Sequence, residues 1–178
     1  MNKIAQALSD EEITQAAEWF AKLPPVAGWT KVTEASTVAK TFVGGGRMRY
    51  ASPEGGTEPL GNRIITLPAD QSRVTKRDPH SGFVAYVPVG SIKRGEVLVT
   101  TGGSKTLPCT YCHGADLRGL GPVPGLANRS PSYLARQIYD FQQGTRAGTW
   151  SALMKPVVEK LTVADMVDIF AYTASRQP

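Results

Sequence analysis

Apolar residues recur at helical spacing in three stretches in the second half of the chain. These stretches are 90–103, 130–144 and 161–175, and each is predicted to form a short amphipathic helix. The residues expected to face the core are Ile92, Val97 and Leu98 in the first stretch, Tyr133, Leu134, Ile138 and Phe141 in the second, and Met166, Ile169, Phe170 and Thr173 in the third.

Each of these stretches begins and ends with residues that favour helix termini. Hydroxyl side chains are common N-caps because they accept hydrogen bonds from the first free backbone N–H groups, and glycine is common just after the last turn. The expected signals are Ser91 and Gly102 for the first helix, Ser130, Pro131 and Gly144 for the second, and Thr162 with Asp165 three residues on for the third.

The stretch 24–88 has a different pattern. "RIITLP" (63–68) and "GFVAYVPVG" (82–90) are rich in β-branched and aromatic residues and predict short strands, separated by turns rich in glycine and proline. We expect a β- and loop-rich connecting segment that wraps the helical part without forming an independent domain. His80 lies in a predicted turn and is expected to be exposed. The arginines of the segment are expected to be solvated: Arg47, Arg49, Arg63, Arg73 and Arg77.

Composition excludes several classes of protein. The net charge of +5 is spread along the chain without the basic stripe typical of nucleic-acid binding. There is no run of 18 apolar residues, so no transmembrane helix is expected. The N-terminus lacks the layout of a signal peptide, so either the protein is cytoplasmic or its export signal lies outside this sequence.

The two cysteines of the chain fall in one motif, "CTYCHG", in which Cys109, Cys112 and His113 are grouped. A structural zinc site needs four ligands, and no second Cys or His pair follows. A thioredoxin-like redox pair expects a preceding strand, and a structural disulfide does not require the histidine. Covalent haem attachment explains all three residues, because two thiols add to the haem vinyl groups and the next histidine reaches the iron. We rank this interpretation first.

A c-type haem iron commonly takes a sixth ligand, often a methionine thioether. Met154 is the preferred candidate, because "GTWSALMKPVV" is expected to be a loop that ends at Pro156. Met166 is expected to pack in the core, and Met48 to lie at the surface. His80 is the main rival, since a second imidazole would lower the reduction potential.

Residues 89–175 resemble the class I c-type cytochromes and are closest to the bacterial two-haem subfamily with tandem domains. The resemblance rests on "CTYCHG", "GPVPGLANRSPSYLARQIYDFQQGTRAG", "ALMKP" and "LTVADMVDIFAYTAS". It implies a mainly α fold, with small helices around one covalent haem c. It also implies roles for particular residues: thioether bonds at Cys109 and Cys112, axial ligands His113 and Met154, a carbonyl of Pro124 that accepts from the His113 ring, and Arg146 and Trp150 near the haem propionates.

The function that this resemblance implies is electron transfer in the periplasm, not enzyme catalysis. The expected partners are redox proteins such as a cytochrome bc complex, a terminal oxidase or a dehydrogenase. Two alternatives remain: an electron-entry subunit of a larger dehydrogenase or oxidase complex, and, less favoured, a haem peroxidase or sensor with an open sixth position.

The start of the chain repeats its end without a gap. Residues 1–23 align with 154–176, so that Met1 falls on Met154 and Ser9 on Thr162. The first 23 residues are therefore predicted to be the C-terminal helix of a preceding cytochrome-like domain, either truncated or kept as a remnant, and to pack on the rest of the chain. The predicted organisation is this remnant at 1–23, the connecting segment at 24–88 and a haem-binding domain at 89–178.

Overall fold

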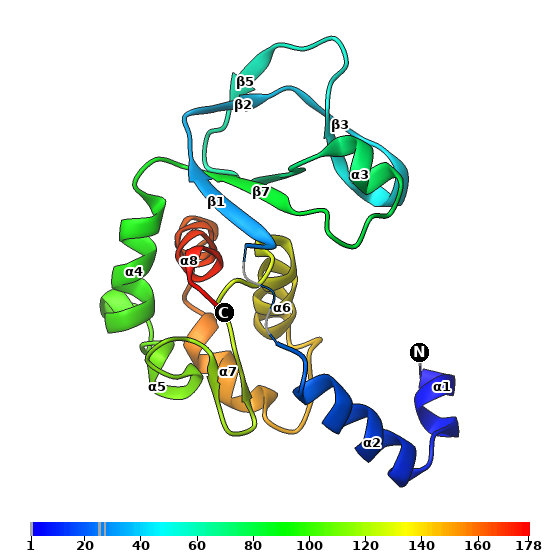
Figure 1. Ribbon diagram of the computed structural model, residues 1–178. Coiled ribbons are helices and arrows are strands. Elements are labelled where there is room, and N and C mark those ends of the chain that lie inside the picture. The colour runs from blue at the N-terminus through cyan, green and yellow to red at the C-terminus, as the bar shows by residue number, and fades with distance from the viewer. Residues whose placement is uncertain (1, 25, 27) are drawn as a thin grey trace.

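The protein consists of a helical body, a lobe of strands and a pair of N-terminal helices that project to one side (Figure 1). The computed structural model describes residues 2–24, 26 and 28–178. The expected mainly α architecture with a strand-rich extension is confirmed. The helices of the body are α4 (Ser91–Thr101), α5 (Thr110–His113), α6 (Pro131–Gln143), α7 (Ser151–Val158) and α8 (Val163–Ser175).

The predicted ends of α6 are correct. Ser130 is its N-cap residue, Pro131 its first residue and Gly144 its C-cap, in the left-handed conformation at φ 72°. The prediction for α4 is wrong at one position. Gly90, also left-handed, is the N-cap, and Ser91 is the first helical residue. The start of α4 is instead capped from the strand lobe, because the Ile92 N–H donates to the Glu34 carboxylate at 3.0 Å.

The predicted capping box of α8 is also present. The Thr162 hydroxyl accepts from the Asp165 N–H, and the Asp165 carboxylate accepts from the Thr162 N–H. Burial of Asp165 works to raise its pKa, but the Lys105 ammonium at 2.7 Å and the Thr162 hydrogen bonds outweigh that effect. The pKa of Asp165 therefore lies below its ordinary value.

Helices α4 and α8 cross in close contact at Gly95. A Cβ atom at this position would lie 1.9 Å from the backbone oxygen of Asp168, so only glycine fits the observed crossing. Beside it, the Arg94 guanidinium donates to both carboxylate oxygens of Asp168, at 2.9 and 3.0 Å. This crossing fixes α4 across α8.

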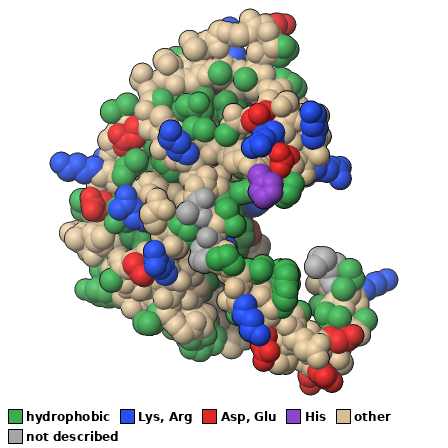
Figure 2. Space-filling view, viewed as in Figure 1, with side chains coloured by type: hydrophobic (Ala, Val, Ile, Leu, Met, Phe, Trp, Pro, Cys, Tyr) green, Lys and Arg blue, Asp and Glu red, His purple; other side chains and the backbone are tan. Residues whose placement is uncertain are grey.

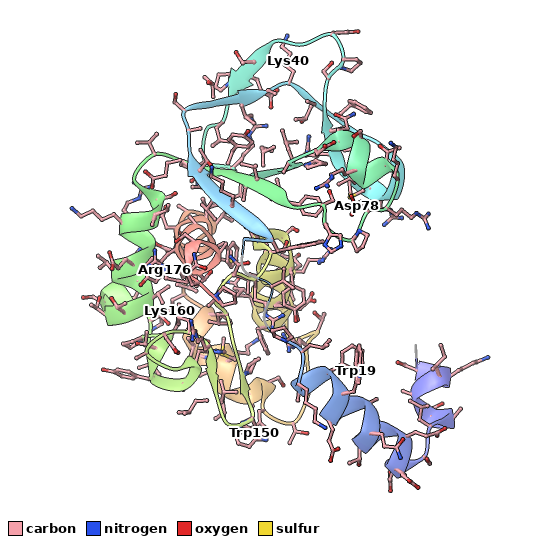
Figure 3. All side chains as sticks on the ribbon, viewed as in Figure 1. Trp19, Lys40, Asp78, Trp150, Lys160 and Arg176 are labelled. Atoms are coloured by element: carbon pink, nitrogen blue, oxygen red, sulfur yellow. The ribbon has the colours of Figure 1, made fainter. Side chains whose placement is uncertain are left out.

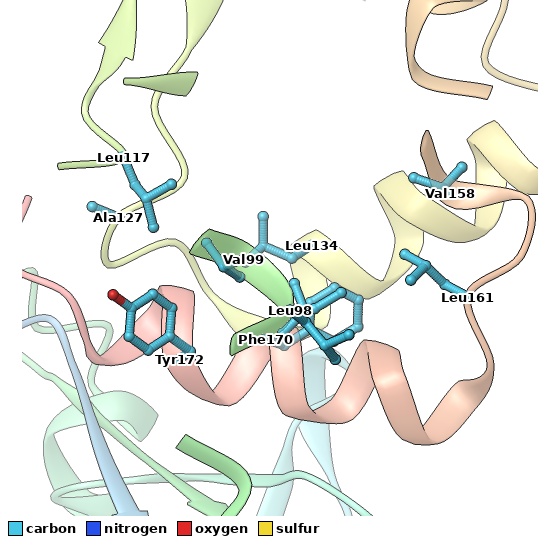
Figure 4. Close-up of a cluster of buried hydrophobic side chains, with 10 residues drawn as sticks. Leu98, Val99, Leu117, Ala127, Leu134, Val158, Leu161, Phe170 and Tyr172 are labelled. Atoms are coloured by element: carbon cyan, nitrogen blue, oxygen red, sulfur yellow. The ribbon is translucent and has the colours of Figure 1, made fainter. Parts of the chain in front are cut away.

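The core of the body lies between α4, α6, α7 and α8 (Figure 4). Aliphatic and aromatic side chains from all four helices meet there, together with two from the loops after α5 and one from the turn between α7 and α8. These buried residues are Leu98, Val99, Leu117, Ala127, Leu134, Val158, Leu161, Ile169, Phe170 and Tyr172. Of the expected core-facing residues, Tyr133 and Val97 are exposed.

The strand lobe contains a three-stranded sheet in the order β1-β7-β6, with β1 and β7 parallel and β6 and β7 antiparallel. The two predicted strands correspond to β6 and β7. Four further short strands form the antiparallel pairs β2–β5 and β3–β4. The elements of the lobe are β1 (Thr30–Glu34), β2 (Thr37–Ala39), β3 (Thr41–Val43), η1 (Gly45–Arg47), β4 (Arg49–Ala51), β5 (Thr57–Pro59), β6 (Ile65–Pro68), α3 (Gln71–Thr75) and β7 (Phe83–Val87).

The lobe has a small core of its own and packs on the body through β1, which contacts α8. It lies at the end of the body away from α5 and α7 (Figure 1). The expectation that this segment wraps around the part of the body that carries the thiol motif is therefore wrong. Pairing of β1 with β7, which are far apart in the sequence, gathers the segment into a separate layer instead.

The N-terminal helices are α1 (Asn2–Ala7) and α2 (Asp10–Ala21). A capping box of Ser9 and Glu12 is present in α2. The prediction that this helix packs on the rest of the chain is wrong, because Ile13 and Phe20 remain 46% and 66% exposed. Figure 3 shows Trp19 on this projecting helix, apart from the body. Met1, the residue aligned with Met154, lies outside the described residues.

None of the described helices combines the length and the apolar character needed to cross a bilayer.

Candidate functional site

The thiol motif follows directly from the C-terminal end of α4. That helix ends at Gly102, whose left-handed backbone begins the short turn η2 (Gly102–Ser104). The chain then returns, and the Cys109 N–H donates to the Val99 carbonyl in the last part of α4 at 2.9 Å. The two thiols are thereby carried by a turn anchored to a core helix.

The two cysteines have different environments. Cys109 packs against the hydrophobic core of the body, whereas Cys112 is exposed, and neither forms a disulfide. Burial raises the pKa of the Cys109 thiol to about 11. Cys109 is therefore a neutral thiol at physiological pH, and it lies in an apolar environment.

His113 ends α5 and is buried, with 7% of its surface exposed. Its Nδ1 lies 2.6 Å from the carbonyl oxygen of Pro124. Since a carbonyl can only accept, Nδ1 is the protonated nitrogen, and in the neutral ring Nε2 keeps its lone pair. The ring is thus fixed in one tautomer and one orientation.

Pro124 is positioned by a hairpin of β8 (Gly119–Leu120) and β9 (Val123–Pro124). Gly119 has a φ of 99°, and a Cβ atom there would lie 2.7 Å from the Val123 carbonyl oxygen. The tight hairpin therefore requires glycine at this position. The predicted partner of the His113 ring, the carbonyl of Pro124, lies where the resemblance implied.

Met154 lies within α7, so the prediction of a non-helical loop at this position is wrong. Pro156 also lies inside this helix, where it removes one backbone hydrogen bond without ending the helix. Met154 is partly buried and packs against the same core cluster as Cys109. The turn after α7 is held to α6 by Gln142, whose side-chain amide donates to the Val158 and Leu161 carbonyls at 2.7 and 2.9 Å.

The other candidate residues are placed as follows. Arg146 stacks over the Phe141 ring, 4.5 Å from its centroid, and also donates to Gln137. Trp150 is 58% exposed at the start of α7, and Figure 3 shows it at the edge of the body. Neither position tests the expected contact with haem propionates. His80 is exposed, as predicted.

The other two described methionines lie in different parts of the molecule. Met166 packs against the core, as predicted, and Met48 is partly buried in the strand lobe.

A rim of exposed apolar side chains lies at the end of the body that carries the thiol motif, and apart from Trp150 its members were not predicted from the sequence. Its members lie on α5, on the hairpin and on α7 and the turns before these helices, and they do not form a periodic pattern. They are Leu107, Tyr111, Leu120, Trp150 and Leu153, each between 58% and 72% exposed.

The residues at this site fit a covalently attached haem. Two free thiols lie on one turn, beside a buried imidazole whose unprotonated nitrogen is available. The apolar rim would be covered by a flat, largely hydrophobic ring system. Large apolar groups left in water are unfavourable, so such a cover would stabilise the fold.

Searches against known proteins found clear relatives, although no family model matches the sequence. "Cytochrome c-554(548)" of Halomonas halodenitrificans is 39% identical over 77 residues, which cover 43% of this chain and 93% of that protein. "Cytochrome c-552" of Acidithiobacillus ferridurans is 33% identical over 118 residues, 65% of this chain and 49% of that protein. "Thiosulfate dehydrogenase electron acceptor" of Thiomonas intermedia is 30% identical over 135 residues, 74% of this chain and 61% of that protein. The chain thus spans about half the length of one of these relatives and about three fifths of another.

Proposed function

Because this chain belongs to the class I c-type cytochromes, whose members carry covalent haem c and transfer electrons, we propose that it is an electron carrier with a single haem. Cys109 and Cys112 would hold the haem, and His113 and Met154 would ligate its iron. When bound, it supplies an iron that alternates between the ferric and ferrous states. The observation that carries the proposal is the buried His113 ring, with Nδ1 bonded to Pro124 and Nε2 free.

His113 acts here as an oriented nitrogen ligand. The hydrogen bond from Nδ1 to the Pro124 carbonyl prevents rotation of the ring and increases the basicity of Nε2. Orientation therefore does not depend on the iron itself, because α5 and the β8–β9 hairpin provide it.

Met154 supplies a sulfur that would raise the reduction potential relative to a second imidazole. Its support is α7, which Gln142 ties to α6 through two hydrogen bonds. A helix held in this way restrains the thioether, and a retained ligand at the sixth position excludes small molecules from the iron.

The test uses the haem-loaded protein and two matched variants. Met154→Leu removes the sulfur at nearly constant volume, and Met166→Leu does the same at the core-packed methionine. We expect the sulfur-to-iron charge-transfer band to disappear only in Met154→Leu, and the pyridine haemochrome assay to give one haem per chain. A band that survives in Met154→Leu would contradict the ligand assignment, and two haems per chain would contradict the single site.

We further propose a periplasmic location and transient partners among respiratory redox proteins, such as a cytochrome bc complex, a terminal oxidase or a dehydrogenase.

A second candidate function is that of an electron-entry subunit fixed in a larger complex. The exposed apolar face of α2 favours it, as does similarity to a protein named as the electron acceptor of a thiosulfate dehydrogenase. Gel filtration of the native protein separates the two, since a carrier elutes alone. Binding of carbon monoxide to the ferrous protein would instead indicate an open sixth position, as in a peroxidase or sensor.

For the N-terminal region we propose that residues 1–23 correspond to the last helix of a unit like 89–178, with 24–88 as the connecting segment. The support is the capping box, which occurs in the same register in α2 and α8. The apolar face of α8 is covered by α4, whereas the corresponding face of α2 is exposed.

A further inference from the structure

The strand lobe contains a hollow of about 450 Å³, at the opposite end of the molecule from the thiol motif. It lies between the β3–β4 pair, the turn η1 and the helix α3. Its lining combines aromatic, apolar and polar side chains with one guanidinium. The side chains that line it are Phe42, Met48, Tyr50, Gln71, Val74, Thr75 and Arg77.

One wall of the hollow is aromatic. Phe42 and Tyr50 face each other across β3 and β4, with ring centroids 5.9 Å apart and planes inclined by 32°. The Tyr50 ring lies close to Gly44, where an added Cβ would lie 2.8 Å from a ring carbon. Gly44 therefore allows Tyr50 to pack against the loop, where it is buried, whereas Phe42 is 44% exposed and available to a flat group.

The opposite wall carries Arg77, whose backbone is in an unusual conformation. Arg77 follows α3 at the position where the chain reverses: its N–H donates to the Val74 carbonyl, and the next N–H donates to the Arg73 carbonyl. This is a Schellman turn, in which glycine is preferred because the residue is left-handed. Arg77 occupies it at a φ of 57°. A strained residue of this kind points to a role for its side chain.

A second left-handed arginine lies on the turn that borders the hollow, Arg47 at a φ of 59°. Among the described residues, neither Arg47 nor Arg77 has a side-chain hydrogen bond or ion pair. The neighbouring acids are already engaged: Asp78 with Arg73 at 3.2 Å, and Asp70 with the first N–H groups of α3.

The surroundings of the hollow are positively charged. Figure 2 shows Lys and Arg side chains gathered on the right-hand side of the lobe, where α3 and the β3–β4 pair lie, with acidic groups among them. Figure 3 labels Asp78 at the end of α3, on the same side. The cationic residues of these elements and their turns are Arg47, Arg49, Arg73, Lys76 and Arg77.

We propose that this hollow is a binding site for a small organic anion with a flat apolar body, of the aromatic carboxylate class. The exposed Phe42 ring and Met48 take the apolar body, and the Arg77 guanidinium takes the carboxylate through two parallel N–H donors. Arg47 adds positive charge at the mouth. The strain at Arg77 is retained because glycine, which would suit the turn better, cannot bind the anion.

The test uses the haem-loaded ferrous protein labelled with ¹³C at the methionine methyl groups. Met48 lies in the hollow, and its signal is assigned with Met48→Leu. Benzoate is titrated as the probe, with benzamide and inorganic phosphate as the matched neutral and non-aromatic compounds. We expect a saturable shift of the Met48 methyl with benzoate, and affinities at least tenfold weaker for the other two.

Two variants separate binding from folding. Arg77→Gly should bind benzoate at least tenfold more weakly while its Tm stays equal to the parent or rises, because the turn loses its strain. Lys31→Gln removes one exposed positive charge from β1 of the same lobe and should bind as the parent does. The proposal is overturned if Arg77→Gly binds benzoate normally, if its Tm falls, or if benzoate leaves the Met48 signal unmoved.

Discussion

Substitution of Gly95 by alanine tests the helix crossing that holds the body together. The added Cβ would lie 1.9 Å from the Asp168 oxygen, whereas ordinary contact begins near 3.4 Å, so α4 and α8 would have to separate by about 1.5 Å. The obstacle is backbone, which cannot rotate away as a side chain can. A shift of that size would also break the paired hydrogen bonds of Arg94 with Asp168, which lie at 2.9 and 3.0 Å.

Two opposing effects determine how much Gly95→Ala changes the stability of the fold. Alanine gains roughly 1 kcal/mol over glycine inside a helix. Overpacking costs about 1–3 kcal/mol and sometimes more, and an immovable carbonyl favours the upper end. Together with the strained ion pair, we expect a net loss of about 2 kcal/mol, which for a chain of this length lowers Tm by about 4–8 °C.

The assay is thermal unfolding of the haem-loaded protein, followed by circular dichroism. Gly148→Ala is the matched control, because a Cβ there meets nothing within 4 Å. Its Tm should stay close to that of the parent. If Gly95→Ala melts at or above the parent temperature, the reasoning is refuted, since helix propensity would then outweigh a contact that is not as close as described.

Three further predictions concern other parts of the fold. Gln142→Leu should lower the free energy of unfolding in urea by about 1–3 kcal/mol, because two partly buried carbonyls lose their donor, whereas the exposed Gln143→Leu should not. Because the pKa of Asp165 is lowered in the folded state, ionised Asp165 stabilises the fold above the ordinary aspartate value near 4. This contribution is lost as the pH falls through the folded-state pKa. The stability difference between the parent and Asp165→Asn, measured as urea midpoints, should therefore be smaller at about pH 3 than at about pH 6. Phe20→Ser should change stability by no more than about 0.5 kcal/mol, while Phe170→Ala should cost about 3–5 kcal/mol, and a comparable loss for both would mean that α2 is covered after all.

The parts of the fold that sequence predicted well depend on neighbouring residues. The limits of α6 follow from Ser130, Pro131 and Gly144, which act within one turn of the backbone they cap. The same holds for Thr162 and Asp165 at the start of α8. The thiol motif is equally local, since its chemistry lies within five consecutive residues.

The parts that it missed depend on contacts between distant segments. Ser91 is a residue type that favours the N-cap position. The Ile92 N–H at the start of α4 is instead bonded by the carboxylate of Glu34, which lies on a strand 58 residues away in the sequence. The Gly95 crossing depends on Asp168, which no local pattern reveals. Pro156 was expected to keep Met154 out of a helix, although a short helix that gains packing and the Gln142 hydrogen bonds tolerates one missing bond.

Helix α4 is hydrogen-bonded at its two ends to two different parts of the molecule. Its first turn is held by Glu34 of the strand lobe, and its last turn accepts from the Cys109 N–H of the turn that carries the two thiols. The helix therefore works as a stiff lever about 16 Å long, given its 11 residues. A tilt of the lobe would therefore be passed along α4 to the backbone that carries Cys109 and Cys112.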